Sequence, residues 1–207
     1  MLTSRKQRPL ERDETTLRDA TLIVIATEGA KTEVGYFSRF GGSRLKVRVI
    51  PAVDNRSSPK DILQNILNFQ TEYDLDQDDQ LWVVIDRDRW KLDQLKHVAR
   101  ECHAKSIDLA VSNPCFELWL ALHLDQELPE MDPGVEAHHN AKLLETFLRD
   151  TLGSYNKANP DIDKFADGLD RAIVAAKALD IAPADRWPNT IATRVYRLME
   201  KIQQLSR

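Results

Sequence analysis

Short apolar runs alternate with amphipathic segments over the first part of the chain. Residues 22–26 and 81–85 are continuously apolar, which is typical of strands buried on both faces of a sheet. Apolar positions at 47–50 and 107–111 predict two further strands. Helical spacing predicts helices at 32–40, 59–69, 92–99 and from Pro114 onward. This alternation predicts an α/β fold with a mostly parallel, four-stranded central sheet covered by helices on both faces.

From about Leu124 onward the apolar pattern is helical only. Residues 141–152, 162–176 and 191–205 predict three amphipathic helices. We therefore divide the chain into a peripheral N-terminal arm at 1–19, an α/β domain at 20–124 and a helical extension at 125–207. The arm mixes basic and acidic side chains with little apolar content. We expect the extension to pack on the α/β domain or on a partner.

Composition narrows the functional classes. The net charge of −4 argues against a protein that coats nucleic acid indiscriminately, although it permits a local contact. No apolar run approaches the roughly 20 residues of a membrane-spanning helix, and the charged N-terminus lacks a secretory signal. Cys102 and Cys115 give neither a disulfide framework nor metal-ligand spacing. We therefore expect two buried free thiols in a cytoplasmic protein without membrane contact.

Acidic residues follow the two most apolar strands. Glu28 comes directly after the first, and Asp86 and Asp88 come after the second. The carboxyl ends of parallel strands meet at one edge of a sheet, where ligands bind. An extended backbone would bring both aspartates to one ion, and hard carboxylate oxygens suit Mg²⁺ or Mn²⁺. Each residue alone could instead cap a helix or a turn, but their joint placement favours a metal site. Glu33 is explained by the dipole at the start of a helix.

Several segments resemble the RloB-like family. The sequence IVIATEGAKTE at 23–33 is similar to the family's opening motif, and WVVIDRD at 82–88 resembles its aspartate motif. The most distinctive match is SNPCFELWL at 112–120, with later landmarks at 155–157 and 189–194. The resemblance extends from about Thr21 to the C-terminus. Thr27 and Ala30 depart from the residues usual at their positions, but neither departure removes a proposed ligand.

The resemblance implies a Toprim-like, three-layer Rossmannoid sandwich. It also implies divalent-metal phosphodiester chemistry on DNA or RNA, possible substrates being tRNA and invading DNA. The expected setting is an anti-phage or restriction-linked defence system of bacteria or archaea. The expected partner is an ATPase encoded in the same locus.

Each acidic or amide candidate has a structural alternative. As a nuclease, the chain would hold metal through Asp86 and Asp88, while Glu28 would complete the coordination or move a proton. Glu117 is a candidate further ligand, or it forms a structural ion pair. Asn113 could orient Asp86, but asparagine before proline is also an ordinary helix-start residue.

Basic candidates for phosphate contact are scattered along the chain. Lys31 lies in the first crossover, next to Glu28, and Lys157 matches a position of the family. Arg194, Arg197 and Lys201 form a basic stripe on the last predicted helix, which suits a nucleic-acid backbone. Solvated surface positions are the alternative for all of these residues.

Two functions remain open from the sequence. The first is a metal-dependent nuclease. The second is a non-catalytic module that binds a nucleotide or an ATPase partner through the same crevice. A dinucleotide-binding enzyme is poorly supported, because the first crossover lacks a G-x-G-x-x-G sequence.

Overall fold

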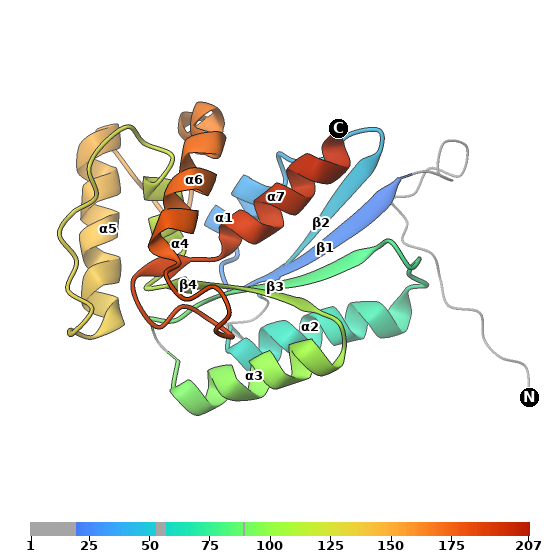
Figure 1. Cartoon of the computed structure of the whole chain (residues 1–207). Helices are drawn as coiled ribbons and strands as arrows, with labels where there is room; N and C mark the ends of the chain where they lie inside the picture. The colour runs from blue at the N-terminus through green and yellow to red at the C-terminus, as the bar shows by residue number, and fades with distance from the viewer. Residues whose placement is uncertain (1–19, 53–56, 89) are drawn as a thin grey trace, which may run out of the picture.

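Five strands form a central sheet between two layers of helices in the computed structural model, which describes residues 20–207 except 53–56 and 89 (Figure 1). The predicted arm at 1–19 lies outside the described residues. The elements in chain order are β1 Thr21–Thr27, α1 Thr32–Phe37, β2 Leu45–Pro51, α2 Pro59–Glu72, β3 Gln80–Asp86, α3 Leu92–Ala104, β4 Asp108–Asn113, α4 Phe116–Ala121, α5 Ala137–Leu152, the 3₁₀ helix η1 Ile162–Gly168, α6 Leu169–Leu179, β5 Ala192–Thr193 and α7 Val195–Ser206. The predicted α/β class is confirmed.

The strand order is β2-β1-β3-β4-β5. The first four strands are parallel, as predicted, and β5 pairs antiparallel with β4 through Ser112 opposite Thr193. The prediction of four strands is therefore one strand short. The helical pattern at 191–205 includes residues 192–193, because a two-residue strand leaves no periodic signal, whereas α7 begins only at Val195.

Both faces of the sheet are covered by helices. Ile23 and Ile25 of β1 face a core built with α1 and α4 to α7, whereas Leu22, Val24 and Ala26 face α2 and α3. In Figure 1, α2 and α3 lie below the sheet and α1 and α7 lie above it. Burial on both faces explains why residues 22–26 of β1 are apolar at every position rather than at alternate ones.

The helices after Leu124 share a core with the sheet. Leu144 of α5, Ile173 of α6 and Leu198 of α7 belong to the same buried cluster as Ile23 of β1. The last helix, α7, contacts both β4 and β2 and so forms part of the layer above the sheet (Figure 1). Within the described ranges, no helix has the length and apolar character needed to cross a membrane.

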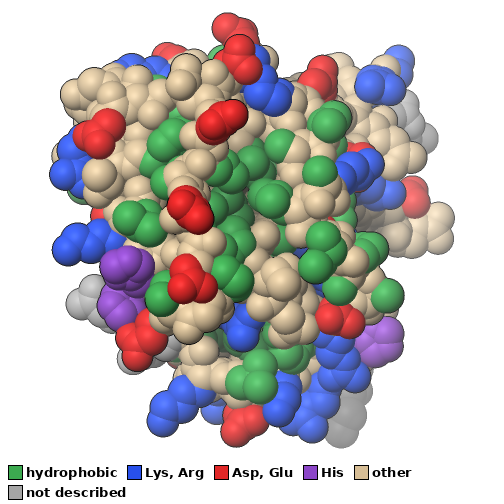
Figure 2. All heavy atoms as spheres, turned by 60° about the vertical axis from the view of Figure 1, so that its left-hand side comes forward, with side chains coloured by type: hydrophobic (Ala, Val, Ile, Leu, Met, Phe, Trp, Pro, Cys, Tyr) green, Lys and Arg blue, Asp and Glu red, His purple; other side chains and the backbone are tan. Residues whose placement is uncertain are grey.

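An apolar groove lies on the face formed by the later helices. Figure 2 shows hydrophobic side chains gathered in a recessed band on this face, with acidic side chains along it. The groove has a volume of about 530 Å³ and runs between the segment after α4 and helix α6. Val174 and Ile181 are 69% and 75% exposed. Helix α6 therefore leaves Val174 at the surface, and Ile181, which follows the helix, is exposed as well.

Candidate functional site

The candidate site lies beside β1, where the order of strands in the sheet reverses. From β1 the chain crosses to β2 on one side, and β3 lies on the other side of β1, which opens a crevice at the carboxyl ends of β1 and β3. Glu28 follows β1 directly, and Asp86 is the last residue of β3. The backbone N–H of Asp86 donates a hydrogen bond of 3.3 Å to Oε2 of Glu28. Strand order thus brings together two residues that are 58 positions apart.

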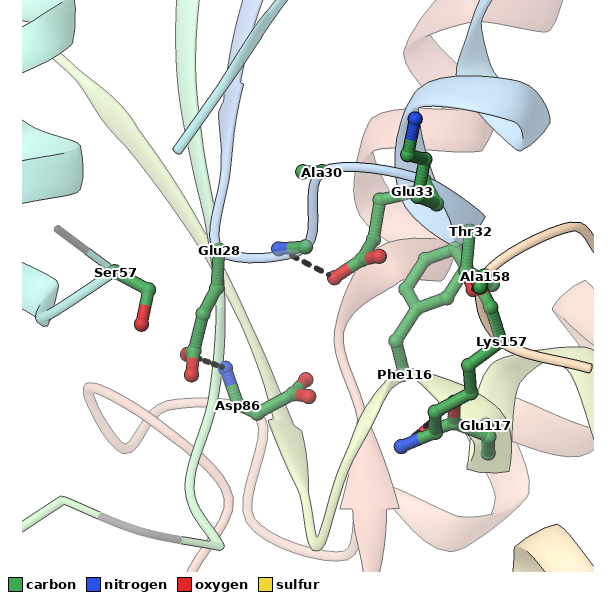
Figure 3. A pocket seen from close by; sticks show the side chains of 12 residues that line it. Glu28, Ala30, Thr32, Glu33, Ser57, Asp86, Phe116, Glu117, Lys157 and Ala158 are labelled. Atoms are coloured by element: carbon green, nitrogen blue, oxygen red, sulfur yellow. Dashed lines mark hydrogen bonds and ion pairs between the residues drawn. The ribbon is translucent and has the colours of Figure 1, made fainter. Parts of the chain in front are cut away.

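Four carboxylates line one cavity of about 350 Å³ at this crevice, which we call the acidic cavity. They belong to Glu28, Glu33, Asp86 and Glu117, and the lysines at the cavity are Lys31 and Lys157. In Figure 3, the carboxylates of Glu33 and Asp86 project toward the space between them. The cavity therefore concentrates negative charge at the edge of the sheet where the sequence predicts a metal site.

Glu28 is held in place by two donors on one carboxylate oxygen. Glu28 is 8% exposed. Its Oε2 accepts a 2.9 Å hydrogen bond from the indole Nε1 of Trp90 and a second hydrogen bond from the backbone N–H of Asp86. These donors fix the orientation of the carboxylate, which is a requirement for binding an ion in a defined position.

Glu33 is a site residue that the sequence reasoning missed. Its Oε1 accepts a 2.9 Å hydrogen bond from the backbone N–H of Gly29, and the residue is buried. Burial raises the pKa of Glu33 to about 7, and the charges of Glu117 and Glu28 add to the rise while backbone hydrogen bonds oppose it. The sequence feature that could have indicated Glu33 is Gly29. A Cβ at this position would lie 1.8 Å from Oε2 of Glu33, so only glycine leaves room for the carboxylate where it lies.

The neighbouring carboxylates of the cavity repel the charge of Asp86. Burial raises its pKa well above the ordinary value, and the neighbouring Glu28, Glu33, Glu117 and Asp88 raise it further. Each carboxylate makes ionisation of the next one more costly, because little solvent screens them. A cation among these groups would reverse the effect.

Glu117 contacts the ammonium group of a lysine and the hydroxyl group of a tyrosine. Its Oε1 lies 3.1 Å from Nζ of Lys157 and accepts a 3.0 Å hydrogen bond from the hydroxyl group of Tyr155. Lys157 also lies 2.6 Å from Oε1 of Glu145, and its side chain is 41% exposed. Burial lowers the pKa of Lys157, but the two carboxylates outweigh burial and raise it. Lys157 is thus already paired inside the protein, and Glu117 has a partner other than a metal.

The structure does not bring Asp88 into the acidic cavity. Asp88 lines a second cavity of about 370 Å³, which we call the side cavity. The expected extended backbone from Asp86 to Asp88 is not observed, because residues 87 and 88 form a bend and a turn. The N–H of Arg87 donates to the carbonyl groups of Ser112 and Pro114, at 2.9 and 3.1 Å.

Asn113 also lines the side cavity. Its Nδ2 donates a 2.7 Å hydrogen bond to the carbonyl group of Thr190, and the residue is 8% exposed. The side chain therefore anchors the segment before β5 and does not cap α4, whose N-cap residue is Cys115.

Arg194 is not available to a nucleic acid. It is 1% exposed, and Nε and Nη2 donate to the two carboxylate oxygens of Asp180 at 3.0 and 3.1 Å. Further bonds reach the carbonyl groups of Ala182 and Asp185. The expected phosphate contact is therefore wrong, because Arg194 precedes α7 and points inward. Arg197 also binds Asp180, at 3.3 Å.

The residues of the acidic cavity fit a divalent cation chemically. Their donors are hard carboxylate oxygens, which suit Mg²⁺ or Mn²⁺. Among the described residues, no three His, Cys, Asp or Glu side chains form a ready-made metal-binding set. Mg²⁺ does not need such a set, because it commonly binds one or two carboxylates and keeps water or phosphate oxygens as its other ligands. Glu28 and Asp86 are the pair that would hold it.

Comparison with known proteins assigns the chain to a family. No curated protein and no solved structure gives a significant match. The family model described as RloB-like protein matches residues 23–202 of the 207, a range that includes Glu28, Glu33, Asp86 and Glu117. This match covers most of the chain and every carboxylate of the acidic cavity. The chain therefore belongs to the RloB-like protein family.

Proposed function

We propose that this protein is a divalent-metal-dependent nuclease that cleaves phosphodiester bonds in DNA or RNA, tRNA among the RNA candidates. The observation that carries the proposal is the group of buried carboxylates where β1 and β3 part, with Asp86 in a field of like charges. Such a cluster is costly to a protein unless a cation neutralises it. Nucleic-acid phosphates are anions that a bound Mg²⁺ or Mn²⁺ would attract and activate.

The chain's own residues have distinct parts in this proposal. Glu28 and Asp86 would hold the ion, which supplies charge stabilisation for the phosphate when bound. Trp90 and the Asp86 backbone orient the Glu28 carboxylate. Lys31 lies exposed at the acidic cavity and is the candidate for phosphate contact there. Glu28 alternatively moves a proton to or from the attacking or leaving oxygen.

The wider setting is supported by the sequence resemblance. The motifs at 23–33, 82–88 and 112–120 resemble those of proteins related to the Toprim nucleases. We therefore include in the proposal a role in anti-phage or restriction-linked defence, with an ATPase partner from the same locus. An activating partner would explain how a cell tolerates a nuclease until infection occurs.

The direct test is cleavage by the purified chain, with and without its ATPase neighbour. Plasmid DNA and total tRNA are incubated with Mg²⁺, with Mn²⁺ or with EDTA, and the products are resolved on gels. Asp86→Asn keeps the shape of the side chain and removes its charge, so cleavage should fall by at least about a hundredfold, the scale of a lost charge interaction in the transition state. Asp93→Asn, at a side chain 95% exposed on α3, is the matched control and should cleave as wild type.

A non-catalytic module is the second candidate. It is favoured by one observation: Glu117 and Lys157 neutralise each other, so part of the cavity is already satisfied without metal. In this case wild type and Asp86→Asn would protect cells equally, and neither would cleave nucleic acid with the ATPase present. That result would overturn the nuclease proposal.

A further inference from the structure

The side cavity shares a wall with the acidic cavity. Trp90 lines the side cavity, while its indole Nε1 donates to Oε2 of Glu28 in the acidic cavity. Arg87 and Asp88, which directly follow β3, also line the side cavity. A ligand seated there would therefore be separated from the proposed metal residues by a single indole ring and the end of one strand.

A buried acceptor without a partner points to a ligand in the side cavity. Asn140 lines it and is 2% exposed. Its Nδ2 donates a 2.8 Å hydrogen bond to the carbonyl group of Asp132, but its Oδ1 accepts no hydrogen bond from the part of the chain that the structure describes. Buried acceptors are rarely left unsatisfied in native proteins. A ligand that fits here should offer an N–H or O–H donor.

The remaining walls suit a flat heteroaromatic ring. Val135, Ile191 and the ring of Trp90 provide apolar surface, and the charged residues at the cavity are Arg87 and Lys91 together with Asp88 and Glu136. The volume of about 370 Å³ lies within the range of small-ligand sites. A nucleobase has an apolar face and N–H donors on its edge, and so matches the apolar walls and the unsatisfied acceptor of Asn140.

We propose that the side cavity binds an unpaired nucleobase of the nucleic acid whose phosphate reaches the acidic cavity. This inference rests on the proposed function and narrows it to single-stranded or locally unpaired substrates. A base edge inside a duplex is paired and stacked, and it must leave the helix to enter a pocket. The base would pack against Trp90 and donate a hydrogen bond to Oδ1 of Asn140.

Binding without cleavage tests the inference separately from catalysis. Fluorescein-labelled single-stranded RNA, single-stranded DNA and a blunt duplex of one sequence are titrated in EDTA, with anisotropy as the readout. Val135 is 40% exposed, so Val135→Trp can fill the side cavity without disturbing the packing of the core. Val174→Trp, at a 69% exposed valine on α6 outside both cavities, is the matched control.

We expect single strands to bind more tightly than the duplex. Val135→Trp should weaken single-strand binding about tenfold, the scale of losing one stacked base, and Val174→Trp should not. Asn140→Leu should weaken it as well, while Asn140→Asp, which retains an acceptor, should bind better than the leucine variant. Folding of each variant is verified by its thermal unfolding midpoint.

The outcomes separate this inference from the nuclease proposal. Equal affinity for single strands and duplex, or equal weakening by both tryptophan variants, would overturn the nucleobase site even if metal-dependent cleavage is seen. Conversely, single-strand binding that Val135→Trp abolishes, in a protein that never cleaves, would retain the nucleobase site and overturn the nuclease.

Discussion

At the residue scale, the surroundings of a buried side chain, rather than its residue type, separate the functional candidates from the structural ones. Glu33 and Arg194 are both ionisable and both buried, but Glu33 lines the acidic cavity whereas Arg194 is enclosed by partners inside the fold. The sequence pattern explains Glu33 by the dipole at a helix start and places Arg194 on a basic stripe. Only their surroundings distinguish a residue that can meet a ligand from one that supports the chain.

His123 makes stability depend on pH. It is buried near the end of α4, where Nδ1 bonds to the carbonyl oxygen of Trp119 and Nε2 bonds to the hydroxyl group of Tyr36. Burial lowers the pKa of His123 from 6.5 to about 4. The unfolded chain therefore takes up this proton first as pH falls, and the neutral histidine's contribution to stability is lost between pH 6.5 and 4.

We expect the free energy of unfolding to fall by about 2 kcal/mol, because of His123, when the pH is lowered from 7.5 to 5. Urea unfolding of wild type and His123→Gln at the two pH values measures the difference. The glutamine variant should lose this part of the pH dependence. His138→Gln, at a side chain 66% exposed, should keep it. Identical pH profiles for His123→Gln and wild type would contradict the assignment.

At the element scale, the last third of the chain depends on contacts that periodicity does not report. The predicted helix at 162–176 is a 3₁₀ helix followed by α6, with Gly168 at the junction. A Cβ at Gly168 would lie 2.2 Å from the carbonyl oxygen of His123, so the chain segments meet backbone to backbone there. Likewise, β5 exists because it pairs with β4, although its two residues fit a helical pattern.

Arg194 joins these elements to one another. Its bonds connect the residue before α7 to Asp180, at the end of α6, and to the carbonyl groups that follow it. Arg194→Leu should lower the free energy of unfolding by about 3–5 kcal/mol, because it leaves the Asp180 carboxylate buried beside an apolar side chain. Arg197→Leu, at a side chain 35% exposed, removes a second partner of the same aspartate and should cost about 1 kcal/mol or less. Chemical denaturation gives both values, and equal losses would show that burial is not the cause.

At the scale of the whole molecule, the acidic cavity couples stability to metal. The carboxylates oppose one another in the absence of a cation, so an ion that binds only the folded chain should stabilise it. A tenfold excess of Mg²⁺ over its Kd corresponds to about 1.4 kcal/mol, or a rise in Tm of roughly 3–5 °C for a chain of this size.

Asp86→Asn should reverse the order of stability between conditions. In EDTA the variant should melt at or above wild type, because it removes one of the repelling carboxylates. In Mg²⁺ wild type should gain stability and the variant should not. Differential scanning fluorimetry at matched ionic strength measures both, with Asp93→Asn as the control expected to follow wild type. A wild-type Tm that does not change when Mg²⁺ is added would contradict metal binding in this cavity.

The α/β class, the four parallel strands and the family can all be predicted from the amino-acid sequence alone. Continuous apolar runs at 22–26 and 81–85 require burial on both faces, and that requirement is local to each strand. Two buried free thiols at Cys102 and Cys115 also agree with the prediction from the sequence. The nearness of Glu28 and Asp86 followed from the rule that parallel strands end at one edge.

Tertiary packing sets which side chains share a cavity. Glu33 joins Glu28 because Gly29 leaves room for its carboxylate, and Asp88 lines the side cavity because the chain bends and turns after Asp86. The inward orientation of Arg194 depends on Asp180, which lies 14 residues earlier in the chain. Local periodicity specifies the elements, because each element buries its own apolar face. The partners of a charged side chain come from distant segments, and packing alone brings those segments together.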